Sequence, residues 1–219
     1  MVAVRSLGLW TALALILGVG VEARALTITH TLDQHFGSDP ASGFVTATYD
    51  DGGGSGSVTL TLDSNGLDLA GEFVAAWYIN FTGDPTSLSF AYEGGSSSGP
   101  AATVSTGTDS FMADGDGNFD ILFDFPQGAG NRFDIDEVVV YTITGIGITA
   151  ADFDDFSAAG GGQGTYLSAA KINGTCLGSP GCTDNNEGSD WVGAVPEPNA
   201  TLLFGVGCLV AGIAAQRKR

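Results

Sequence analysis

Apolar and polar residues alternate along much of residues 26–194, and this alternation constrains the fold more than any other feature of the sequence. In the segment Phe73–Phe81 every odd-numbered residue is apolar, and Val58, Leu60 and Leu62 alternate with polar neighbours. A period of two places such side chains on one face of a β-strand. Clusters of Gly, Ser, Asp and Pro separate the segments and supply the backbone conformations of turns.

At least seven such segments predict an all-β fold, an antiparallel β-sandwich of jelly-roll-like type. One short helix is expected near Thr149–Phe156, because Thr149 and Asp152 have the spacing of a capping box. Trp77 is expected in the core, and His30 is expected to be a packed strand histidine. The other predicted strands are Leu26–Leu32, Phe44–Tyr49, Leu88–Tyr92, Phe119–Phe125 and Phe133–Ile143, the last interrupted at Glu137.

The body formed by residues 26–194 is strongly acidic. Its only cations are Arg132 and Lys171, against 23 carboxylates, which gives a formal charge of −21. A surface of this sign repels phosphate backbones, so nucleic acid is excluded as a partner and anionic lipid head groups are disfavoured. Metal cations and neutral sugars are compatible partners.

Residues 1–25 have the three parts of a secretory signal peptide. Arg5 lies near the start, an apolar run extends from Leu7 to Val21, and the small residues Ala23 and Ala25 stand at the end. We expect signal peptidase to cleave after Ala25, which makes the body an exported domain. An uncleaved anchor helix is the alternative.

Residues 195–219 have the composition of a membrane anchor. Val195, Pro196, Glu197 and Pro198 precede the apolar segment 200–215, and Arg217, Lys218 and Arg219 end the sequence. Sixteen apolar residues are slightly short of a bilayer, which takes roughly 20, but terminal cations extend such a helix by snorkelling. Positive charge favours the cytoplasmic side, so a transmembrane helix here places the body outside.

These three parts, in this order, resemble the PEP-CTERM sorting signal. The resemblance implies an exported protein of a Gram-negative bacterium, recognised through Pro196, Glu197 and Pro198 by exosortase, a membrane protease-transpeptidase. It also implies association with exopolysaccharide and biofilm production. The protein is then membrane anchored until processing and afterwards at the cell surface or in the extracellular matrix. A plain single-pass anchor is the alternative.

Two cysteines of the body bracket a short loop. Cys176 and Cys182 are the only cysteines in residues 26–194, and in an oxidising compartment we expect them to form a disulfide. A metal site is the other interpretation, but the neighbouring residues offer no further ligands of the right type.

One acidic segment has the spacing of a cation-binding loop. Asp114, Asp116, Asn118 and Asp120 place oxygen ligands at every second position, a pattern that can wrap a hard cation such as Ca²⁺. The match to an EF-hand loop fails at its sixth and twelfth positions, which are both Phe. A polar Asp-Gly turn leading into a strand is the other interpretation, and we favour it slightly. No other cofactor is expected.

The sequence offers little catalytic equipment. His30 and His35 are the only histidines, and neither belongs to a nucleophile motif. We therefore expect a structural or exopolysaccharide-associated protein with no catalytic role, and a glycan-active enzyme is less favoured. A polysaccharide- or calcium-binding module is the alternative, with Trp191 and Tyr166 as its candidate sugar-stacking aromatics.

We predict that deleting Arg217–Arg219, or replacing Pro196-Glu197-Pro198, blocks C-terminal processing while export continues. The three-part signal is the reason, since the first cut depends on the leader alone. Fractionation of the native host and the intact mass of the protein check this. Wild-type processing of both variants would contradict the sorting interpretation.

Overall fold

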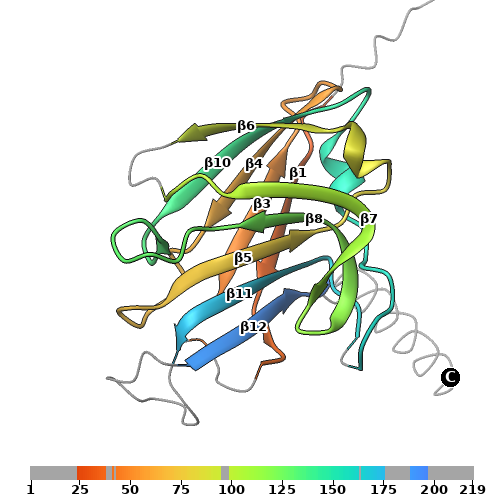
Figure 1. Cartoon of the computed structure of the whole chain (residues 1–219). Coiled ribbons are helices and arrows are strands. Elements are labelled where there is room, and N and C mark those ends of the chain that lie inside the picture. Colours follow the sequence, from red (N-terminus) through yellow and green to blue (C-terminus); the bar gives the residue numbers. More distant parts are fainter. Residues whose placement is uncertain are drawn as a thin grey trace, which may run out of the picture.

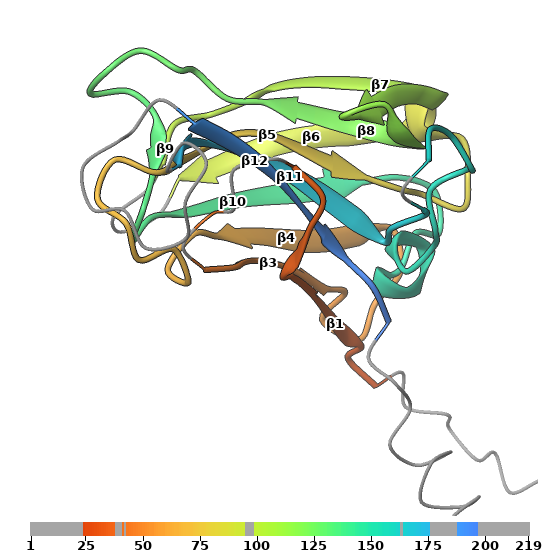
Figure 2. The ribbon, with the colours of Figure 1, turned by 90° about the horizontal axis from the view of Figure 1, so that it is seen from below.

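A computed structural model describes residues 24–37, 41, 43–94, 99–162, 164–175 and 188–196. These residues form two antiparallel sheets that pack face to face (Figures 1 and 2). One sheet has five strands, in the order β1 (Thr27–Leu32), β3 (Val45–Asp50), β4 (Ser57–Asp63), β10 (Val138–Thr144) and β6 (Ser89–Gly94).

The other sheet has seven strands and faces the viewer in Figure 1. Its order is β2 (Gln34–His35), β12 (Gly188–Ala194), β11 (Ser168–Thr175), β5 (Phe73–Ile79), β8 (Asp116–Asp124) and β7 (Thr103–Ala113), and the short β9 (Phe133–Asp134) also pairs with β5. The predicted all-β sandwich is therefore confirmed. The finer jelly-roll-like assignment stays a prediction.

The two helices of the described part are single 3₁₀ turns, η1 (Pro85–Ser87) and η2 (Ala150–Phe153). The expected short helix is η2, but it covers only four residues. The Asp152 carboxylate accepts hydrogen bonds from the Thr149 amide (2.7 Å) and hydroxyl (3.0 Å), so the predicted pair does hold the start of the helix. The proline in η1 fits its first turn, where no backbone donor is needed.

Alternation places the core where the sequence predicted it. Val58, Leu60 and Leu62 of β4 are completely buried between their polar neighbours. Strand β5 differs, because all seven of its residues are buried. Trp77 and Ile79 point into the main core between the sheets, whereas Ala76 and Tyr78 belong to a second apolar cluster on the opposite face. Trp77 and His30 are both buried as expected.

Several predicted features lie outside the described residues. They are residues 1–23 of the leader, Ala23 included, Cys176 and Cys182, Glu197 and Pro198, the apolar segment 200–215, and Arg217, Lys218 and Arg219. Within the residues that the structure does describe, no helix is both long and apolar enough to cross a membrane.

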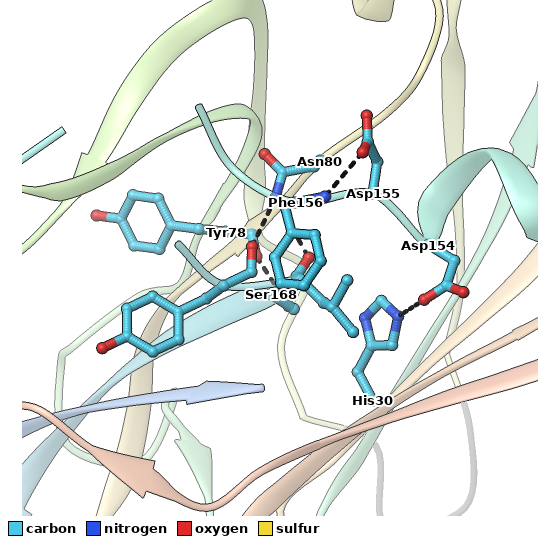
Figure 3. Close-up of polar contacts among 9 residues, drawn as sticks. His30, Tyr78, Asn80, Asp154, Asp155, Phe156 and Ser168 are labelled. Carbon is cyan, nitrogen blue, oxygen red and sulfur yellow. Dashed lines mark hydrogen bonds and ion pairs between the residues drawn. The ribbon is translucent and has the colours of Figure 1, made fainter. Parts of the chain in front are cut away.

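A buried serine joins the core tryptophan to the neighbouring strand. The Trp77 Nε1–H donates to Ser168 Oγ (2.8 Å). The Ser168 hydroxyl donates to the Tyr78 carbonyl (2.8 Å; Figure 3). Both side chains have no exposed surface. The serine therefore satisfies an indole donor that has no access to water.

We predict that Ser168→Ala lowers the free energy of unfolding by about 1–3 kcal/mol, because the Trp77 N–H loses its acceptor. Urea unfolding measures this, with Ser57→Ala as the control, since Ser57 is an exposed serine of β4. The cost should shrink in a Trp77→Phe background, which has no indole donor. A Ser168→Ala cost as small as that of Ser57→Ala would refute the buried contact.

Candidate functional site

The outer face of the seven-stranded sheet carries a cluster of aromatic rings. We call the rings of Phe36, Tyr78, Phe119, Tyr166 and Trp191 the outer aromatic patch. Phe36 stacks on Tyr166 with ring centres 4.7 Å apart and an interplanar angle of 14°. Tyr78 lies 5.5 Å from Trp191 and 5.7 Å from Phe119. These spacings are those of packed aromatic pairs, so the rings support one another.

Strand register brings the patch together from distant parts of the sequence. Trp191 of β12 pairs with Lys171 of β11, which pairs in turn with Ala76 of β5. Beyond β12, the Phe36 amide donates to the Trp191 carbonyl (2.9 Å). One cross-strand row therefore carries an aromatic ring, a cation and a small residue side by side.

A glycine makes room for Tyr166 over β12. A Cβ built on Gly193 would lie 2.4 Å from Tyr166 Cδ1, far inside a normal contact distance. Tyr166 therefore lies directly against the backbone of the strand next to Trp191. The absence of a side chain at Gly193 lets the ring pack flat enough to stack on Phe36.

The patch is open at one end and closed at the other. Phe119 is fully buried, and Tyr78 and Tyr166 keep 9 % and 7 % of their surface exposed. Trp191 and Phe36 are half-buried, so their rings offer apolar surface to solvent. Lys171 Nζ lies 5.6 Å from the centre of the Trp191 ring, within range of a cation–π interaction. One of the two cations of the body is thus placed at its exposed aromatic face.

The phenols of the patch are held in their protonated form. Burial raises the pKa of both Tyr78 and Tyr166, and the nearby carboxylates of Asp124 and Asp116 raise these pKa values further. Each hydroxyl therefore keeps its proton and can act as a hydrogen-bond donor at any pH near neutrality.

A separate cleft of about 420 Å³ lies at the edge of the sandwich where β1 meets the end of β12. His30, Asp154, Val195 and Pro196 are among the residues that line it. His30 Nε2 lies 3.2 Å from Asp154 Oδ1 (Figure 3). The predicted first residues of the sorting motif thus lie beside the first strand.

The cleft histidine is mainly a packed residue. Its ring is 3 % exposed and meets Tyr49 edge to face at 5.1 Å. Burial lowers the pKa of His30, and the Asp154 carboxylate opposes that shift only in part, so the ring is neutral at pH 7. The other histidine, His35, contacts the buried carboxylate of Asp190 at 2.5 Å. Asp190 also accepts from the amides of Gly37 and Ala41, and so it holds the segment after β2 against β12.

The segment proposed for calcium forms the turn and first residues of the β7–β8 hairpin. Ala113 pairs with Asp116, and the two residues between them have positive φ angles, 51° for Asp114 and 79° for Gly115. This is the backbone of a two-residue hairpin turn that favours Asp-Gly. Asn118 exchanges backbone hydrogen bonds with Ala158. The segment therefore forms the polar Asp-Gly turn that the sequence predicted.

Its two buried carboxylates accept hydrogen bonds from backbone amides. Asp116 Oδ1 accepts from Gly162 (2.5 Å), while Asp120 accepts from Phe81 through Oδ2 (3.0 Å) and from Asp109 through Oδ1 (2.8 Å). In the described part of the chain, His, Cys, Asp and Glu side chains do not gather in groups of three or more that could hold a metal ion. The calcium interpretation stays a prediction.

The sequence named two members of the outer aromatic patch, Trp191 and Tyr166, and the structure brings them together through Phe36. It did not point to Phe36, because a lone Phe in a short segment looks like any other core residue. It expected Phe119 only as part of the strand Phe119–Phe125, and the structure places this ring in the second apolar cluster instead of the main core. Phe36 lies opposite Trp191 because β2 pairs with β12. Only a prediction of that strand pairing could have identified Phe36 as a member of the patch.

The described body is thus an acidic β-sandwich with an aromatic outer face, whose C-terminal end passes beside its first strand. Residues 194–219 match the family model described as the PEP-CTERM protein-sorting motif. The match confirms the predicted sorting signal, and it indicates an exported protein that exosortase sorts. Neither a curated protein nor a solved structure matches the chain.

We predict that Asp120→Ala lowers the free energy of unfolding by about 2–4 kcal/mol. The substitution leaves the backbone amides of Phe81 and Asp109, which have little access to water, without their hydrogen-bond acceptor. The loss should be equal in EDTA and in Ca²⁺, since the carboxylate serves the backbone. Urea unfolding in EDTA, Ca²⁺ and Mg²⁺ at matched ionic strength measures it.

The control is Asp114→Asn, which keeps the turn and should leave stability unchanged in all three solutions. A stabilisation that is specific to Ca²⁺ and is lost in Asp114→Asn would contradict the interpretation of this segment as only a turn. It would indicate a calcium site, because a ligand that binds the folded state stabilises it by mass action.

Proposed function

We propose that this exported, exosortase-sorted protein is a non-catalytic surface or matrix component whose sandwich associates with exopolysaccharide. The outer aromatic patch carries the proposal. Partly exposed rings on a rigid sheet are a suitable platform for sugars, because the C–H face of a pyranose packs against an aromatic face while its hydroxyls stay hydrated. Trp191 and Phe36 supply that exposed ring surface.

Rigidity favours this use of the patch. Trp191 is held by the β11–β12 ladder, by Tyr78 and by Lys171, so few side-chain rotamers are lost when a ligand binds. The phenols of Tyr78 and Tyr166 lie beside the rings and remain donors for sugar hydroxyls. The face thus combines stacking surface with hydrogen-bond donors.

Charge selects the kind of polymer. A body of −21 disfavours strongly anionic chains over most of its surface. The cation at the patch, Lys171, offsets this only locally. The proposed ligand is therefore a neutral polysaccharide.

The absence of a catalytic role is part of the proposal. Structural roles account for both histidines, since His30 packs against Tyr49 and His35 binds the carboxylate that organises the segment after β2.

We predict that Trp191→Ala weakens binding of neutral exopolysaccharide about tenfold, the loss expected for one aromatic stacking contact. Affinity electrophoresis and calorimetry with polysaccharide from the producing cells measure it. Phe44→Ala is the matched control, because Phe44 is an equally apolar ring, 45 % exposed, away from the patch.

Phe44→Ala should bind like the wild type. Two results would overturn the proposal: no binding by the wild type, or equal binding by the Trp191→Ala variant. Release of reducing ends from the polysaccharide would instead indicate a glycan-active enzyme.

A further inference from the structure

The start of the body is tied to a single carboxylate. The Leu26 amide donates to Asp51 Oδ1 (2.9 Å), and the Asp51 amide donates back to the Leu26 carbonyl (3.2 Å). This reciprocal pair extends the β1–β3 ladder, whose last pair is Thr27 with Asp50. Leu26 therefore has a fixed position although it is 41 % exposed.

Asp51 also contacts two other segments. Its Oδ1 accepts from the Gly53 amide (2.9 Å) in the β3–β4 turn, and its Oδ2 faces the Ala150 amide (3.4 Å) at the start of η2. These hydrogen bonds lower the pKa of Asp51, and the Leu26 amide contributes most. The carboxylate is thus ionised and held in place by the fold before any further partner arrives.

The leader places a cation in the cleft that this carboxylate lines. Arg24 lines a cleft together with Asp51, Gly53, Gly54, Ser55 and Thr149, and among these residues Arg24 and Asp51 carry the charges. Arg24 leaves the body when signal peptidase cleaves after Ala25. The nearest carboxylate along the strand is Asp50, whose Oδ1 accepts from the Gly52 amide instead.

We propose that Asp51 is the receptor for the mature N-terminus, and that leader removal completes an ion pair between the Leu26 α-ammonium and the Asp51 carboxylate. Hydrolysis of the Ala25–Leu26 bond adds water, leaves a carboxylate on Ala25 and turns the Leu26 amide nitrogen into an ammonium. The nitrogen that now donates one hydrogen bond at 2.9 Å then carries a positive charge and three donors. The proposal rests on the predicted cleavage site and is independent of polysaccharide binding.

The ion pair has a defined pH dependence. The carboxylate raises the pKa of the α-ammonium above its unfolded value of about 8. The stabilisation is therefore fully present below that unfolded value and is lost as pH rises through the folded one. Because the pair is exposed, a rise on the order of half a unit is expected.

The test compares mature full-length chains that begin at Leu26 and continue to Arg219, in detergent. The α-amine is titrated through its rate of acylation, read site by site by mass spectrometry. In Asp51→Asn the α-amine should titrate about half a unit lower than in the wild type. Asp50→Asn is the matched control, and it should titrate like the wild type.

A chain that begins at Ala25 is the second arm, because it moves the ammonium one residue away from Asp51. Its α-amine should titrate like that of Asp51→Asn. Equal titration in the wild type and Asp51→Asn would overturn the proposal, as would a mature N-terminus from the producing cells that is not Leu26. Neither result would change polysaccharide binding by the outer aromatic patch, so the two proposals fail separately.

Discussion

All seven residues of β5 are buried, and this double-sided burial organises the rest of the molecule. The strand lies between β11 and β8, and its side chains are apolar on both faces, so burying only one face would leave apolar surface in water. The five-stranded sheet covers the inner face around Trp77. Within the described ranges no second sheet packs on the outer face, and aromatic rings from β12 and the neighbouring loops cover it instead. The outer aromatic patch therefore shields the outer face of β5 from water. The proposed sugar binding uses the two partly exposed rings of this patch, Phe36 and Trp191.

The many carboxylates of the body serve its backbone as well as its surface. Asp51, Asp120, Asp152 and Asp190 each accept at least one hydrogen bond from a backbone amide. A carboxylate that accepts such bonds is stabilised in its charged form, which offsets part of the repulsion within an acidic domain. This use of Asp explains why a short acidic motif such as residues 114–120 is a weak indicator of metal binding here.

Sequence patterning predicted the strands in which apolar residues recur at every second position and missed those that lack this period. Strands β4 and β8 alternate, and both were expected, whereas β7 (Thr103–Ala113) consists mainly of Thr, Ser and Gly and gives no apolar period. Strands β11 and β12 were also missed, because small residues such as Ala169 and Gly193 lie on their outer face beneath larger rings. The outer aromatic patch depends on register between distant strands, which composition cannot supply. The sorting signal was predictable, because it is contiguous and its order carries the information.

The last ladder hydrogen bonds of the fold lie just before the sorting motif. Strand β12 ends at Ala194, whose carbonyl accepts from the Leu167 amide (2.9 Å), and the next two residues line the cleft beside β1. Cutting the chain beyond Pro196 therefore removes no described strand and breaks no ladder. If the sorting motif lay within β12, its removal would break the hydrogen bonds between β12 and β11. This body can therefore lose the residues beyond Pro196 and keep every described ladder hydrogen bond.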